Sequence, residues 1–225
     1  MPATQNGPDK KPLDSAKTAK DVAQAFEAHY RAVRTMAGYF LDKYTSGGSG
    51  LTVESGTVYF EKPGRMRWDY DSPETKMFLV DGKNVWLYVP ADHTASRTSI
   101  RESSDWRTPL ALLAGKVKLE RLCGSVTLAG SGAPGNAERA SETGDSVLIC
   151  RPRKSDEDVF SEVALEVNSR HQLVRLDIQQ PGDIENEFRF GEWHENVPME
   201  ASKFHFTPPA GVAIVDDAAL ASRVQ

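Results

Sequence analysis

The chain has 225 residues, and its 27 basic and 32 acidic side chains leave a formal net charge of −5 at pH 7. This length suits a single domain, and the negative charge offers no general electrostatic attraction to nucleic acid or to an anionic membrane surface. No segment approaches the roughly 18 apolar residues that a membrane-spanning helix needs. We therefore expect a soluble chain that does not bind nucleic acid.

The two ends of the chain differ in character from the rest. Residues 1–16 are polar and rich in Pro and Lys, so we expect a disordered leader there. This stretch lacks the basic-then-apolar pattern of a signal sequence, but exported proteins lose that sequence, and the residues alone leave the compartment open. We expect one folded domain over residues 17–217 and a C-terminal tail over residues 218–225.

An amphipathic helix is predicted at the start of this domain, over residues 17–35. Apolar side chains recur there at steps of four, four and three residues, with charged residues between them, namely Val22, Phe26, Tyr30 and Val33. That spacing places all four on one face of a helix.

From residue 36 onward the apolar period becomes two, which is typical of β-strands. The Asp81-Gly82 pair between two such stretches is a hairpin signal. The strands are expected over residues 36–45, 51–62, 65–70, 75–80, 84–89, 94–101, 146–150, 160–167, 173–179 and 184–192. The prolines of residues 203–209 are expected to end the sheet. The fold class is therefore mainly β, with ten or eleven antiparallel strands curled into a whole or partial barrel.

A short apolar helix is predicted over residues 106–115, where it interrupts the strands. Thr108 and Pro109 are suited to open it and Gly115 to end it. It is too short to be stable alone, so it must pack against the rest of the fold.

Large aromatic side chains gather on one predicted face of the sheet. Alternation places Met66, Trp68 and Tyr70 on the same face. The neighbouring hairpin is expected to add Phe78, Val80, Trp86 and Tyr88, and the last strand adds Phe188 and Phe190. Trp and Tyr are less usual in a dry core than Leu and Ile. The face suits a ligand cavity, although the same residues could simply fill a β core.

Signatures of enzymes and of metal or cofactor sites are missing from the sequence. The five histidines have no metal-ligand spacing, and no G-x-S-x-G nucleophile motif is present. Residues 130–135 fit the letters G-x-G-x-x-G, but Pro134 and the polar residues that follow do not form the helix that a dinucleotide site requires. Acidic residues in the strands are expected at exposed positions. We predict that the chain is not an enzyme and has no cofactor.

Cys123 and Cys150 are too few for a disulfide scaffold and lack the paired spacing of a zinc site. They form either one disulfide or two buried thiols. A disulfide between them would stabilise the fold by roughly 3 to 4 kcal/mol on the chain-entropy estimate.

Four segments in order along the chain resemble the periplasmic outer-membrane lipoprotein carrier family, LolA. They are Glu61–Tyr70 with Pro73 after it, Val80–Pro90, Thr108–Leu110 and Lys203–Val212. The resemblance implies an unclosed antiparallel barrel covered by helices, a periplasmic location and a cavity for lipoprotein acyl chains. It also implies two partners besides the acylated lipoprotein, an inner-membrane ABC lipoprotein-release complex and an outer-membrane lipoprotein acceptor. We expect a monomer.

The resemblance also implies which residues line the cavity. They are Phe26, Tyr30, Val33, Met36, Phe40, Met66, Trp68, Tyr70, Phe78, Tyr88, Leu110 and Leu113. The family often has Arg before Pro63, where this chain has Lys62, and this residue is expected to control the helical lid. A related possibility is a lipid- or lipoprotein-sensing regulatory protein that uses the same half-barrel.

Overall fold

The computed structural model describes residues 17–48, 50–100, 113, 118–130, 141, 143–157, 159–217 and 220. The expected leader, all of the expected 106–115 helix except Leu113, and all of the expected tail except Leu220 lie outside these ranges.

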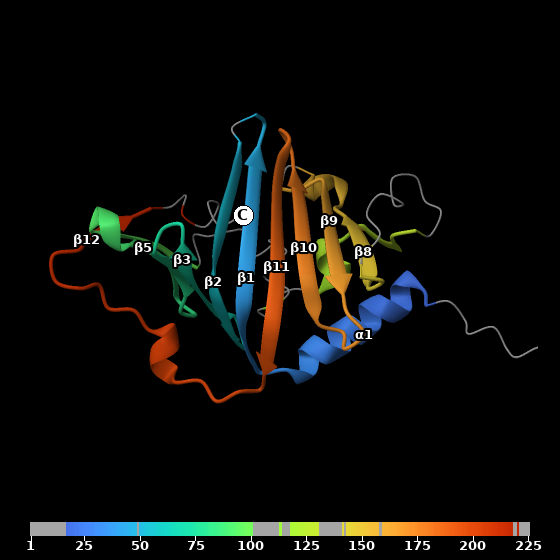
Figure 1. Ribbon diagram of the computed structural model, residues 1–225, viewed down its shortest axis with the longest axis horizontal. Helices are drawn as coiled ribbons and strands as arrows, with labels where there is room; N and C mark the ends of the chain where they lie inside the picture. Colours follow the sequence, from blue (N-terminus) through green and yellow to red (C-terminus); the bar gives the residue numbers. More distant parts are fainter. Residues whose placement is uncertain are drawn as a thin grey trace, which may run out of the picture.

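One sheet of twelve strands forms the body of the molecule (Figure 1). Its spatial order is β12-β6-β5-β4-β3-β2-β1-β11-β10-β9-β8-β7. The strands are β1 (Thr35–Ser46), β2 (Leu51–Glu61), β3 (Arg65–Ser72), β4 (Lys76–Val80), β5 (Asn84–Val89), β6 (Thr94–Ser99), β7 (Ser125–Leu128), β8 (Ser146–Arg151), β9 (Glu162–Val167), β10 (Leu173–Gln180), β11 (Ile184–Glu195) and β12 (Ala213–Asp216). The two edge strands, β7 and β12, do not pair with each other, so the sheet is unclosed, as predicted.

Neighbouring strands run antiparallel, except that β12 runs parallel to β6. All ten expected strands are present. The expectation that residues 203–209 end the sheet is wrong, because β12 adds to the edge after them. Its four residues are all exposed, so they carry no alternating pattern. The four-residue strand β7 was not predicted either.

The predicted N-terminal helix is confirmed as α1 (Ala19–Ala32) and is shorter at both ends than the expected 17–35. A capping box sets its start: the Thr18 hydroxyl accepts from the Asp21 amide, and the Asp21 carboxylate accepts from the Thr18 amide. The helix buries Val22, Phe26 and Tyr30 against the half of the sheet that ends in β8 and β7 (Figure 1).

The remaining helical elements within the described ranges are short. They are α2 (Leu119–Leu122) and the single turns η1 (Pro90–Asp92), η4 (Lys154–Asp156) and η5 (Ala201–Phe204). The chain after β11 packs on the second face of the sheet, where Phe204 is buried with Met77, Leu79 and Trp86. One face of the sheet therefore meets α1, and part of the other meets the segment around η5.

Candidate functional site

The face of the sheet that meets α1 carries a continuous aromatic cluster centred on Trp68. Only 1% of Trp68 is exposed. Its ring centroid lies 4.8 Å from that of Phe40 in β1, 5.4 Å from Phe188 and 6.1 Å from Phe190 in β11. The strand pairing explains these contacts, because β3, β2, β1 and β11 are consecutive neighbours in the sheet. We call this surface the aromatic face.

Helix α1 covers the adjoining part of the aromatic face. The ring centroids of Phe26 and Tyr30 are 4.7 Å apart. The Tyr30 hydroxyl accepts a hydrogen bond from the Leu173 amide at 3.0 Å. Burial is the main reason why the pKa of Tyr30 is raised, so the phenol stays neutral and can keep this contact. The helix is thus fixed to β10 by both apolar and polar contacts.

A second polar contact fixes the C-terminal half of α1. His29 Nε2 lies 2.8 Å from Glu195 Oε1, at the end of β11. The same carboxylate oxygen accepts from Gln172 Nε2 at 2.9 Å. Opening the aromatic face on this side requires these contacts to break.

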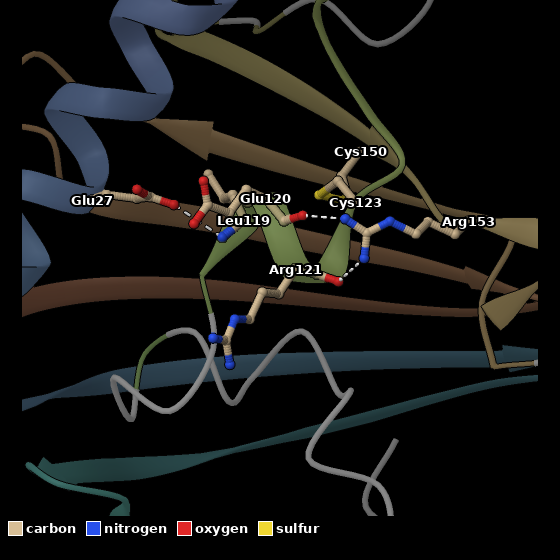
Figure 2. Close-up of a disulfide and its surroundings, with 7 residues drawn as sticks. All are labelled: Glu27, Leu119, Glu120, Arg121, Cys123, Cys150 and Arg153. Atoms are coloured by element: carbon tan, nitrogen blue, oxygen red, sulfur yellow. Dashed lines mark hydrogen bonds between the residues drawn. A yellow bond between two sulfur atoms is a disulfide. The ribbon is translucent and has the colours of Figure 1, made fainter. Parts of the chain in front are cut away.

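Helix α2 and Cys123 directly after it are tied to both α1 and the sheet (Figure 2). Glu27 in α1 accepts from the Leu119 amide at 3.0 Å, which satisfies a free N–H at the start of α2. Arg153 donates to the Glu120 and Arg121 carbonyls at 2.6 and 3.1 Å. Cys123, directly after α2, forms a disulfide with Cys150 in β8. Of the two alternatives left open by the sequence, the structure has the bridge.

The aromatic face becomes polar toward the turn between β1 and β2. Asp42 in β1 is only 7% exposed and lies directly across from Glu54 in β2. Lys76 in β4 donates to both Glu54 carboxylate oxygens at 2.6 and 2.8 Å. The Lys76 Nζ atom also lies 4.5 Å from the centroid of the Tyr70 ring. Asn186 in β11 is buried beside this group. We call these five residues the Asp42 site.

Burial raises the pKa of Asp42 to about 7, and the negative charge of Glu54 acts in the same direction, while Lys76 opposes them. Burial also raises the pKa of Tyr70, with contributions from Asp42 and Glu54. The site therefore holds a carboxyl that changes charge near neutral pH and a phenol that stays neutral.

Residues 31–207 match the family described as outer membrane lipoprotein carrier protein LolA. The match spans more than half of the chain. The chain belongs to the LolA family.

The chain is also similar to two curated proteins and to one solved structure. An outer-membrane lipoprotein carrier protein of Nitrosomonas europaea is 28% identical, with 91% of this chain and 89% of the relative covered. One of Xylella fastidiosa is 27% identical, with 84% and 85% covered. A crystal structure of an uncharacterized conserved protein from Thermus thermophilus has a TM-score of 0.54 at 12% identity and covers 88% of this chain and 99% of that one. This last likeness concerns the fold alone.

The structure brings most of the residues expected to line a LolA-type cavity into one buried cluster. These are Phe26, Tyr30, Val33, Met36, Phe40, Met66, Trp68, Tyr70, Phe78 and Leu113. Because all of them are buried, a ligand can reach the aromatic face only if a covering element moves. Their role in binding stays a prediction, and Leu110 lies outside the described residues.

The placement of Trp86 and Tyr88 on the aromatic face is wrong. Val80 pairs with Val85 across the hairpin, so Val85 and Leu87 share the face of Val80 and Phe78. Trp86 and Tyr88 point to the opposite face. Their ring centroids lie there 5.5 and 5.1 Å from the ring centroid of Phe206.

Lys62 lies where the C-terminal end of α1 meets the start of the sheet. Its amide donates to the Arg34 carbonyl at 3.0 Å. Its side chain is half-buried, and burial lowers the pKa of the ammonium group. Within the described part of the chain, the ammonium group makes no hydrogen bond or ion pair, so the proposed contact with a lid stays a prediction.

The expectation that acidic residues in the strands are exposed is wrong for Glu166 and Asp177, and it is also wrong for Asp42. The signal that could have revealed it was present, because Asp42 follows Met36 and Phe40 at even spacing and so shares their face. In the ranges that the structure describes, no three His, Cys, Asp or Glu side chains are placed to hold a metal ion. No helix in these ranges is long and apolar enough to cross a membrane.

Proposed function

We propose that this LolA-family chain is a non-enzymatic periplasmic carrier that binds the acyl chains of lipoproteins on the aromatic face. It takes a lipoprotein from an inner-membrane ABC release complex and passes it to an outer-membrane acceptor, and it works as a monomer. The observation that carries the proposal is the convergence of ten residues from α1 and its C-cap, β1, β3, β4 and residue 113 into one buried apolar cluster.

The need for such a carrier follows from the hydrophobic effect. Exposing an acyl chain to water costs about 0.8 kcal/mol per CH₂ group, so a lipid anchor does not cross an aqueous compartment without a protein that covers it. The aromatic face offers large, rigid rings on a continuous sheet. The acyl chains would take the place of side chains from α1 and of Leu113, which are buried in the same apolar cluster as these rings.

The covering elements suit a reversible cycle. α1 is held by a few polar contacts, those of Tyr30, His29 and Glu27, together with its apolar face. When lipid leaves, these contacts can form again and offset part of the cost of releasing the acyl chains. We infer that the closed arrangement is the empty state of the carrier.

Incubation with inner-membrane vesicles that contain lipoprotein and a release complex tests the proposal. The chain is expected to bring the lipoprotein into the supernatant as a one-to-one complex, measured by sedimentation and size-exclusion chromatography. Adjacent residues of β1 supply matched variants, because Phe40 is buried in the aromatic face whereas Tyr39 is 56% exposed on the other. Phe40→Ala should reduce release severalfold, whereas Tyr39→Ala should not.

Two other outcomes would contradict the proposal. If the lipoprotein stays with the vesicles at every concentration of the chain, the chain is not a carrier. If the chain binds lipoprotein but never passes it to outer-membrane vesicles that contain the acceptor, a lipid- or lipoprotein-sensing regulatory role fits better.

A further inference from the structure

Two buried oxygen atoms of the Asp42 site lack hydrogen-bond partners among the described residues. They are Asp42 Oδ1 and Asn186 Oδ1, from side chains that are 7% and 4% exposed. Leaving a buried polar atom unsatisfied destabilises the folded state. These two atoms, on adjacent strands, are acceptors that a ligand with N–H donors can satisfy.

The two side chains lie on the same face of the sheet. Asp42 and Tyr44 are two residues apart in β1, so their side chains lie on the same face of the sheet. Tyr44 pairs with Asn186 in β11. Asp42 and Asn186 are therefore diagonal neighbours on one face of the sheet, within reach of a single small group.

The charge at the site favours a cationic donor. Lys76, the one cation of the Asp42 site, already donates to both oxygens of Glu54. When Asp42 is ionised, the five residues carry a net charge of −1. A primary ammonium group has three N–H donors and one positive charge, which matches two free acceptors and one unpaired carboxylate.

The surroundings of the site favour an amphiphile. Asp42 pairs with Phe188 across the β1–β11 contact, and Phe188 packs on Trp68 at 5.4 Å. A ligand with its polar head at Asp42 can therefore lay an apolar chain along the aromatic face without a break between the two contacts.

We propose that the Asp42 site binds the primary ammonium group of an acylated ligand whose chains lie on the aromatic face. The inference rests on the proposed carrier function and adds a specificity to it. Ligands that keep a free amine next to their acyl chains are preferred over ligands in which that amine is capped. The shared chemistry is an ammonium group, supplied by a diacylated lipopeptide or by an ethanolamine phospholipid.

Acid should weaken this contact. The groups that face Asp42 among the described residues are Glu54 from β2, Tyr70 from β3, Lys76 from β4, Tyr44 from β1 itself and Asn186 from β11. Burial and Glu54 hold the pKa of Asp42 at about 7, so at pH 5 the carboxyl is mostly protonated and offers no charge to the ligand.

The experiment compares two lipopeptides with the same two acyl chains and the same neutral peptide. One has a free α-amine at its S-diacylglyceryl cysteine, and the other has that amine acetylated. Affinity is measured by isothermal titration at pH 7.5 and pH 5 with the wild-type chain, Asp42→Asn and a control, Glu185→Gln, whose carboxylate is exposed near the same end of the sheet. Lysophosphatidylethanolamine and lysophosphatidylcholine form a parallel pair, since only the first has N–H donors.

The wild-type chain and Glu185→Gln are expected to bind the free-amine lipopeptide about tenfold more tightly than the acetylated one at pH 7.5, and to lose this preference at pH 5. Asp42→Asn should bind both lipopeptides like the acetylated one. Which pair shows the larger preference identifies the source of the ammonium group. Equal affinity of the wild-type chain for both members of each pair overturns the ammonium site, even if Asp42→Asn fails to fold, and leaves the carrier proposal intact. If no lipopeptide or lysophospholipid binds, both proposals fail.

Discussion

The hydroxyl oxygen of Tyr30, in α1, accepts a hydrogen bond from the backbone amide of Leu173, in β10, at 3.0 Å. This contact joins the covering helix to the sheet at residues that are 143 positions apart in the chain. It is one of the contacts that must break before α1 can leave the sheet.

Tyr30→Phe keeps the ring against Phe26 but removes this acceptor. The buried Leu173 amide then loses its partner, so the free energy of unfolding should fall by about 1–3 kcal/mol. Backbone amides of α1 should also exchange faster with solvent. Urea unfolding and hydrogen exchange measure the two effects, with Tyr39→Phe, an exposed tyrosine, as the control. Unchanged stability and exchange would mean that the Tyr30 hydroxyl does not help to hold the helix.

The disulfide between Cys123 and Cys150 closes a loop with a sequence separation of 27. Replacing both cysteines by Ser should lower the free energy of unfolding by roughly 3 to 4 kcal/mol, because the unfolded chain becomes less restricted. Helix α2 should become more mobile, since only the Arg153 and Glu27 contacts and the burial of Leu119 and Leu122 would then hold it. Counting thiols in denaturant before and after reduction checks the bridge directly, and equal counts would show that it does not form.

Lys62 is predicted to hold the lid by donating to helix carbonyls, either of residues 106–115 or of α1. Arg has five donors in a rigid arrangement, whereas Lys has three on a flexible chain. Lys62→Arg should therefore slow hydrogen exchange in these segments. Lys62→Leu should fold normally but impair handover of bound lipoprotein. Lys154→Arg, in η4, is the control. If neither Lys62 variant changes exchange or delivery, Lys62 is only a surface charge.

Asp42 should make the folded state less stable as the pH rises. The pKa of its carboxyl is about 7 in the folded chain against 3.8 for an unperturbed Asp, so the folded state binds the proton more tightly than the unfolded state does. The stability that this provides is complete below pH 3.8 and is lost as the pH rises through 7. Asp42→Asn removes the effect. Its gain in stability over the wild-type chain should grow by about 2 to 3 kcal/mol between pH 5 and pH 8.

Denaturant unfolding at both pH values gives this difference. Glu166 and Glu187 have lowered pKa values, so the stability that they contribute is lost below pH 4.5 and changes little between pH 5 and pH 8. Hydrogen bonds and ion pairs stabilise their ionised forms despite partial burial. A gain that is the same at pH 5 and pH 8 would show that the Asp42 carboxyl does not titrate in this range.

Alternation predicted the aromatic face well where one side of a strand is clearly apolar, as in Met66, Trp68 and Tyr70. It failed at β5, where large side chains stand on both faces. The second face of that strand is covered by the chain around Phe206, a long-range contact that no local pattern reveals. The pairing of Val80 with Val85 settles the matter, because residues that face each other across a hairpin lie on the same side of the sheet.

The polar part of the site was missed for a different reason. Asp42 was read by its residue type, as an exposed carboxylate, although its spacing from Phe40 places it on the buried face. The partners that shift its pKa come from β2 and β4, and their approach depends on the register of the assembled sheet. The sequence could not decide between a disulfide and two thiols for the same kind of reason, since the positions of two cysteines in the chain do not give their separation in space.

Photocrosslinking from one hairpin tests the central claim, that acyl chains bind on the aromatic face, most directly. Phe78 in β4 points to the aromatic face and Tyr88 in β5 to the opposite one. Each is replaced in turn by p-benzoylphenylalanine, and the chain is irradiated with a lipoprotein that carries radiolabelled acyl chains. The account predicts that label attaches at position 78 and not at position 88. Label at position 88 alone, or at neither position despite binding, would contradict it.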